Sequence, residues 1–173
     1  MDILISSNLE RLLYLSFGAN KCAAYMKALA DNGKYRITPE ELDLLRESFV
    51  GYSASEDECR NTVKEVYEKH RKLIDTHTAV AVYAAEKYMR ENESAVQMLV
   101  VSTASPYKFA TDVYESVTGE RPEDDLKSPS LLEQKTGVKM PEPLRRVLLM
   151  EAIHKDVIDR EKMKESVTEF VIG

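Results

Sequence analysis

The sequence is poor in several residue types that mark particular classes of protein. It has no tryptophan, only two cysteines, and six glycines that are scattered singly along 173 residues. Two cysteines without a CxxC pair give neither a disulfide scaffold nor a cysteine-based zinc site any support. We therefore expect Cys22 and Cys59 to be reduced, packed thiols, and we expect no metal site.

The chain also lacks a net positive charge and long apolar runs. The chain carries 24 basic and 30 acidic residues, for a formal net charge of -6. This balance argues against a general nucleic-acid binder, which needs a clustered basic face. No apolar run approaches membrane-spanning length, and the N-terminus does not resemble a secretory signal. We expect a cytoplasmic protein with neither a nucleic-acid nor a membrane partner.

Strand signals are scarce, whereas helix signals recur throughout the chain. The strongest strand candidate is the valine-rich run Val96–Val101, which suits a strand buried on both faces of a parallel sheet. Phe49–Ser53 and Ile3–Ile5 are weaker candidates. Two or three short strands would leave unpaired edges beside many helices. The pattern predicts an α/β fold, rich in helices, with few short parallel strands and an incomplete sheet that belongs to something larger.

Helix boundaries can be predicted from capping patterns. Thr38 with Glu41 and Ser55 with Glu58 have capping-box spacing, and Pro39 suits a first helical position. Further helices are expected near residues 9–15, 22–29 and 78–89, from Ser105-Pro106 to Gly119, from Ser128-Pro129 to Gly137, and at 144–153 and 160–171.

The segment most suggestive of a functional site is 100–109, where the best strand candidate runs into a helix start. Ligands in open α/β sheets bind beyond the carboxyl ends of strands, and helix N-termini there offer free N–H groups. Ser102, Thr103 and Ser105 place three hydroxyls at this point. The alternative is that Ser105 caps the helix while Ser102 and Thr103 only complete the turn.

Three blocks of the chain resemble the threonine synthase family. STASPYKF at 102–109 resembles its STA(S/H)PxKF motif, MDILISSNLERLL at 1–13 resembles its MDIL(I/V)SSNxERLL, and DTHTAVA at 75–81 resembles its DPHTAVA. Thr76 stands where the family often has proline. The resemblance extends over essentially the whole chain and weakens after Gly119.

The resemblance implies a fold-type II, tryptophan synthase β-like enzyme that uses pyridoxal 5'-phosphate. Such an enzyme is a carbon–oxygen lyase of threonine biosynthesis that converts O-phospho-L-homoserine and water to L-threonine and phosphate. In this fold a neutral hydroxyl of the STA motif holds the pyridine nitrogen, and here that residue would be Thr103. Ser102 is a further cofactor-binding candidate, and Ser105 is a candidate for a nearby polar contact.

Four other residues are candidates for the substrate side or for support of the site. Asn8 and Arg11 could border the cleft, or could belong to a capped surface helix. His77 could transfer protons or could position its turn by hydrogen bonding. Lys108 lies in a first helical turn, which is unfavourable for a cation unless an anion is near; that anion could be a phosphate or a carboxylate of the protein.

Two family blocks do not occur in the chain. The FHGPTxxFKD-like block with the cofactor lysine and the glycine-rich GNFG loop are both missing, and Met1 falls on a methionine that is internal in the family motif. We therefore expect the C-terminal portion of such an enzyme, inactive without its N-terminal remainder. Residues 1–119 would be the C-terminal part of the large cofactor-binding domain, and 120–173 would be an excursion with the terminal helices of the same domain. The alternatives are a non-catalytic helical interaction domain and a related fold-type II phospholyase.

Overall fold

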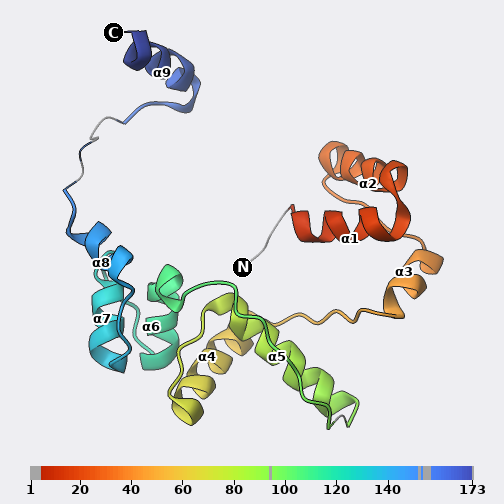
Figure 1. Cartoon of the computed structure of the whole chain (residues 1–173), viewed down its shortest axis with the longest axis horizontal. Helices are drawn as coiled ribbons and strands as arrows, with labels where there is room; N and C mark the ends of the chain where they lie inside the picture. Colours follow the sequence, from red (N-terminus) through yellow and green to blue (C-terminus); the bar gives the residue numbers. More distant parts are fainter. Residues whose placement is uncertain (1–4, 94, 152, 154–156, 173) are drawn as a thin grey trace.

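The structure, a computed structural model, describes residues 5–93, 95–151, 153 and 157–172. Within these residues every regular element is a helix (Figure 1). The α-helices are α1 (Ser7–Phe17), α2 (Ala19–Asn32), α3 (Pro39–Arg46), α4 (Glu56–His70), α5 (Thr76–Glu91), α6 (Ala110–Thr118), α7 (Ser128–Thr136), α8 (Glu142–Leu149) and α9 (Met163–Ile172). Two 3₁₀ turns, η1 (Pro106–Phe109) and η2 (Arg160–Lys162), precede α6 and α9.

The predicted helix starts are confirmed by cap geometry. At α3 the Thr38 hydroxyl accepts from the Glu41 N–H at 3.3 Å, and the Glu41 carboxylate accepts from the Thr38 N–H at 2.9 Å. Ser55 and Glu58 form the same reciprocal pair at α4. Gly119 ends α6 with a φ of 80°, a left-handed conformation that glycine adopts without steric cost.

Helices α1–α3 form a group of their own, which Figure 1 shows apart from α4–α8. Leu13 of α1 and Cys22 of α2 are buried between the first two helices. The third is fixed by Glu41, whose carboxylate accepts from the Lys21 ammonium at 2.6 Å and from the Tyr25 hydroxyl. These two hydrogen bonds lower the pKa of Glu41 to about 2.

The main hydrophobic core lies among α4, α5, α6 and α7. Its buried members come from all four helices and from the turns beside them: Cys59, Val63, Ala79, Tyr107, Ala110, Val113, Leu132 and Met140. The Tyr107 ring is buried in this core, and its hydroxyl donates to the Val138 carbonyl, so the buried polar group has a hydrogen-bond partner. Cys22 and Cys59 are both buried and unpaired, as expected for reduced thiols.

The predicted strands are absent from the described residues. Residues 96–101 and 49–53 have no strand pairing, and of the candidate at 3–5 only Ile5 lies within the described residues. The expectation of burial on both faces is also wrong, because Leu99 is 90% exposed and Val101 is 67% exposed. A strand is defined by the neighbour to which it bonds, and the described chain brings no such neighbour beside 96–101.

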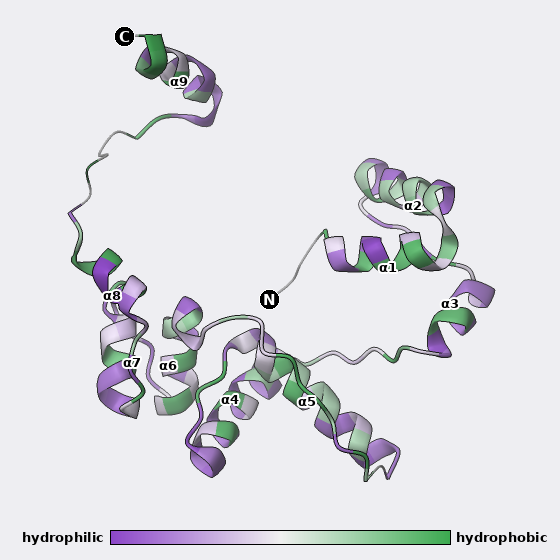
Figure 2. Ribbon diagram, in the orientation of Figure 1, coloured by the Kyte–Doolittle hydropathy of each residue, from purple (hydrophilic) through white to green (hydrophobic). Residues whose placement is uncertain are grey.

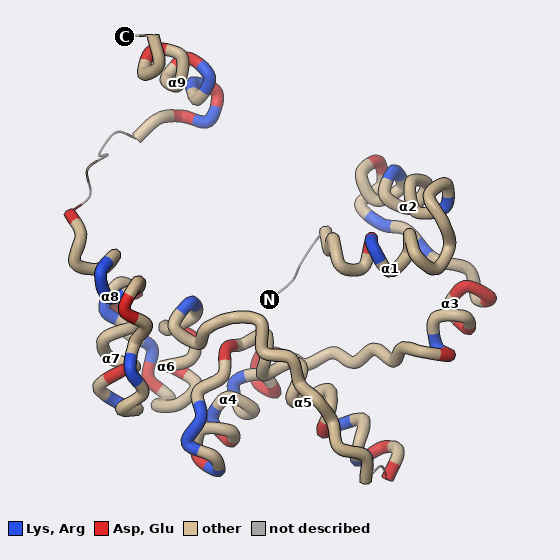
Figure 3. The backbone as a smooth tube through the Cα atoms, viewed as in Figure 1, with Lys and Arg blue, Asp and Glu red and all other residues tan. Residues whose placement is uncertain are grey.

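Two charge-free runs border the same hollow beside α5. Phe49, Val50 and Tyr52 come from the run between α3 and α4, and Val96–Val101 comes from the run after α5. The hollow has a volume of about 750 Å³. Figure 2 shows hydrophobic residues along the run that follows α5, and Figure 3 shows that it carries no charge, whereas acidic and basic residues intermix on the helices.

The chain exposes far more surface than a compact protein of its size. Its accessible area is 13623 Å², whereas a compact monomer of 19.7 kDa exposes about 8,600 Å². Large apolar side chains on the last helices contribute to the excess, including Leu149 and Phe170, each 82% exposed. In the described part of the chain, none of the helices has the length and apolar character that crossing a membrane requires.

Candidate functional site

The candidate site starts where the charge-free run after α5 reaches η1. Ser105 caps η1, and its hydroxyl accepts from the Tyr107 N–H at 3.3 Å, so its capping role is confirmed. Thr103 is exposed, and no hydrogen bond engages its hydroxyl from any part of the chain that the structure describes. A free, neutral hydroxyl at the end of an extended run can donate to or accept from a ring nitrogen. The chemistry of Thr103 therefore fits the group that the STA motif implies.

Asp75 is the most heavily bonded carboxylate beside this segment. It caps α5 and is fully buried. One oxygen, Oδ1, accepts from the Thr78 hydroxyl and from the Thr78 N–H at 3.3 Å. The other, Oδ2, accepts from the His77 N–H at 3.0 Å and lies 3.0 Å from His77 Nδ1. Both oxygens are thus engaged by the first turn of α5, which compensates the cost of burying the charge.

Thr78 joins this cap to the STA segment. Its Oγ1 lies 3.0 Å from Oγ of Ser102, 24 residues further along the chain. The structure therefore brings together His77 and Ser102, two of the residues singled out in the sequence, through Asp75 and Thr78, which were not. A capping aspartate before a threonine was visible in the sequence, but the long-range bond to Ser102 was not.

His77 and Lys108 meet at the same aromatic ring. The imidazole of His77 packs on Phe109 with a centroid distance of 4.8 Å, and Lys108 Nζ lies 5.4 Å from the centroid of that ring. The carboxylate of Asp75 lies 3.0 Å from Nδ1 of the same imidazole. His77 is thus held at the start of α5, consistent with its positioning its turn by hydrogen bonding. Lys108 has a cation–π contact, a possibility that the sequence did not indicate.

Asn8 and Arg11 lie elsewhere, on α1. The Arg11 guanidinium donates to the Asn8 side-chain oxygen one turn earlier, and Ser6 caps the helix. Both residues are exposed, and Figure 1 shows α1 apart from α5 and η1. Within this chain they are not brought to the STA segment.

A cavity of about 650 Å³ opens beside His77, where the first turns of α4 and α5 face α6. Cys59, Arg60, Phe109 and Asp112 also line it. Its volume is within the range of small-molecule sites. The Cys59 thiol donates to the Thr76 carbonyl, and burial raises the pKa of this thiol, so it is suited to packing rather than to nucleophilic attack.

The start of α5 also accounts for the departure from the family pattern at Thr76. Thr76 is the first helical residue after the Asp75 cap. A proline is well accepted at that position because its missing N–H would have no partner in the helix. Threonine or proline can therefore occupy the position without a change in the turn.

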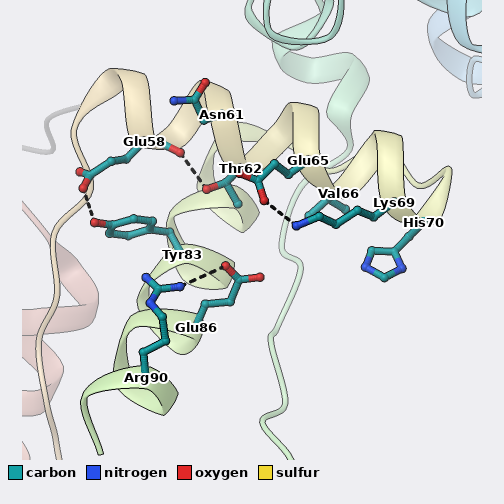
Figure 4. Close-up of a pocket in the computed structure, with 10 residues that line it drawn as sticks. All are labelled: Glu58, Asn61, Thr62, Glu65, Val66, Lys69, His70, Tyr83, Glu86 and Arg90. Atoms are coloured by element: carbon teal, nitrogen blue, oxygen red, sulfur yellow. Dashed lines mark hydrogen bonds and ion pairs between the residues drawn. The ribbon is translucent and has the colours of Figure 1, made fainter.

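A second, polar groove of about 270 Å³ runs between α4 and α5 (Figure 4). Figure 4 shows its charged side chains pointing toward partners within the groove. The Tyr83 hydroxyl donates to Glu58, and Lys69 lies 2.7 Å from Glu65. Such pairs are typical of a solvated helix interface. Among the described residues no cluster of histidine, cysteine and carboxylate side chains is suited to a metal ion.

Comparisons with known proteins agree on one family. The family model described as "Threonine synthase, C-terminal" matches residues 78–167. The threonine synthase of Saccharomyces cerevisiae is 35% identical over 136 residues, which cover 69% of this chain and 26% of that protein. The chain thus spans about a quarter of the length of this curated relative.

Two solved structures are similar to the chain. The crystal structure of threonine synthase from yeast gives a TM-score of 0.74 at 28% identity, and the match covers 99% of this chain and 35% of that one. The X-ray structure of PLP-bound threonine synthase from Brucella melitensis gives a TM-score of 0.56 at 32% identity, over 77% of this chain and 28% of that one. The helical arrangement is therefore one that these structures share.

Proposed function

This chain belongs to the threonine synthase family, and from that premise we propose that it forms the C-terminal portion of an enzyme that converts O-phospho-L-homoserine and water to L-threonine and phosphate. The chain alone would be inactive because the block that carries the cofactor lysine is not in its sequence. The observation that carries the proposal is the STA segment, with Thr103 exposed at the end of an extended run.

The partner that we propose is the N-terminal remainder of the same enzyme. The excess of accessible surface and the hollow beside α5 support it, since both leave apolar groups to be covered. Val96–Val101 is rich in strand-forming residues and has no charge, so a strand of the remainder could pair with it. We propose that these residues form a sheet strand only in the complete enzyme.

The cofactor that we propose is pyridoxal 5'-phosphate, which the Brucella melitensis relative binds. When bound, it supplies an electron sink for carbanion chemistry. Thr103 would hold its pyridine nitrogen through a neutral hydroxyl. Because a hydroxyl does not keep that nitrogen protonated as a carboxylate would, the electron withdrawal is moderated, which suits elimination and replacement rather than transamination.

Phosphate release from O-phospho-L-homoserine tests the proposal. We expect none from this chain alone, and turnover from the protein extended upstream to include the lysine block. Within the extended protein, Thr103→Val should lower kcat/KM by roughly 10–150-fold, which corresponds to the loss of a hydrogen bond worth about 1.5–3 kcal/mol.

Thr103→Ser is the matched control, because it keeps the hydroxyl and should retain most of the activity. Turnover by the chain alone would contradict the inactivity of the portion. An unchanged rate in Thr103→Val would contradict the role of Thr103 at the ring nitrogen.

A further inference from the structure

The hydroxyls of Ser102 and Thr78 and the carboxylate of Asp75 form a chain of hydrogen bonds that leads from the STA segment to the start of α5. A threonine hydroxyl has a single proton to donate. Thr78 donates its proton to Oδ1 of Asp75, which is buried and takes its hydrogen bonds as an acceptor. The bond of 3.0 Å between Thr78 and Ser102 must therefore run the other way, with Ser102 as the donor. The order of donation is Ser102 to Thr78 to Asp75.

This order distinguishes the two neighbouring hydroxyls of the STA segment. The proton of Ser102 is directed into the protein and is not available to a ring nitrogen. The hydroxyl of Thr103, the next residue, has no such bond within the described residues. Thr103 is exposed and directly follows Ser102, the residue that Thr78 holds. Holding Ser102 therefore also limits where the Thr103 hydroxyl can lie.

We propose that Asp75 is a positioning residue that acts through Thr78 and Ser102 to hold the 102–105 segment with the Thr103 hydroxyl facing outward. Ser102 is then the anchor of the segment rather than a donor to the cofactor. The part of this inference that concerns catalysis rests on the proposed function, whereas the ordering of the segment does not. Asp75 is suited to the task because its two oxygens are held by four contacts with the first turn of α5.

The first measurement uses the chain itself and needs no cofactor. In Thr78→Val, a nearly isosteric change, the link to Ser102 is lost while the Asp75 cap keeps its backbone bonds. We expect the ¹⁵N order parameters of residues 102–104 to fall from near 0.85, about the value of a rigid backbone, to below about 0.6. Ser102→Ala, made at an exposed residue that cannot disturb the core, should give the same loosening.

Two variants serve as matched controls. Thr78→Ser retains the hydroxyl and should restore the order of 102–104. Thr62→Val removes another buried helical hydroxyl, which donates to the Glu58 carbonyl at 2.7 Å and, among the described residues, has no bond to the segment. It should leave the order parameters of 102–104 unchanged.

The second measurement uses the protein extended to include the lysine block. Thr78→Val should lower kcat by up to about 100-fold, as misplacement of a catalytic group can, with little change in KM; Thr78→Ser should rescue kcat, and Thr62→Val should not lower it. If residues 102–104 stay ordered in both Thr78→Val and Ser102→Ala, the positioning role is overturned whatever the activity. If they loosen but Thr103→Val is fully active, the positioning role stands and the proposed role of Thr103 fails.

Discussion

The two long faces of α5 differ in what covers them. One face packs on α4 through Ala79, which is fully buried, and through Tyr83, whose hydroxyl donates to Glu58. The opposite face lines the hollow beside the charge-free runs with half-buried side chains at helical spacing: Ala81, Ala84, Ala85 and Tyr88. The first face is complete within this chain, and the second is apolar but open.

This difference helps to explain the large exposed apolar surface of the chain. Helices α4–α7 supply one another with apolar and polar partners, so that the core closes locally. The runs around the hollow have no charge, and several of their apolar side chains stay exposed, as Leu99 does. This apolar face is the surface that the proposed N-terminal remainder would cover.

The largest expected effect on stability comes from a substitution in the closed core among α4–α7. Leu132 is fully buried in the core, so Leu132→Ala should lower the free energy of unfolding by about 2–5 kcal/mol, through lost burial and the cavity left behind. Denaturant unfolding of the chain measures it. Leu126→Ala is the control, because Leu126 is 75% exposed nearby and should change little. Equal losses in the two variants would contradict the closure of the core around Leu132.

The features that depend on nearby residues were the more predictable ones. The pairs Thr38–Glu41 and Ser55–Glu58 are local, and the sequence placed both helix starts correctly. Gly119 and Gly137 likewise end helices where expected. The strand at Val96–Val101 was predicted from composition alone and was wrong for this chain, because a strand depends on a neighbour far away in sequence.

Within the candidate site the same rule holds. The capping role of Ser105 depends on residues two positions away and could be predicted. The bond from Ser102 to Thr78 joins residues 24 positions apart, and His77 packs on Phe109, 32 positions further along the chain; neither contact follows from any local pattern. The sequence therefore located the segment, but it did not identify the contact with Thr78 that joins it to the Asp75 cap.

Acid should weaken the contact between α4 and α5. Hydrogen bonds from Ser55 and Tyr83 lower the pKa of Glu58 from 4.5 to about 2. A pKa lowered in the folded state stabilises the fold above about pH 4.5, and this stabilisation is lost as the pH falls toward about 2. Circular dichroism across that range should show stability falling less steeply with acid in Glu58→Gln than in the unchanged chain.

Glu68→Gln is the charge-matched control, since Glu68 is exposed on the same helix. It should keep the steep acid dependence. The charge-free runs 48–54 and 95–107 around the hollow contain no titrating carboxylate, so substitutions of their apolar residues should leave the slope unchanged. A slope in Glu58→Gln as steep as that of the unchanged chain would show that this carboxylate does not link α4 to α5.

The smallest effect is expected on the open side, where it is also the most informative. Leu99 is 90% exposed, so Leu99→Ala should change the free energy of unfolding of this chain by no more than about 0.5 kcal/mol. In the protein extended upstream, the same substitution should cost about 2–5 kcal/mol if the proposed remainder covers the run. A small loss in both proteins would leave the hollow open and contradict the proposed strand pairing. A large loss in the chain alone, comparable to that of Leu132→Ala, would mean that another copy of the chain already covers this face, since nothing within the described residues does.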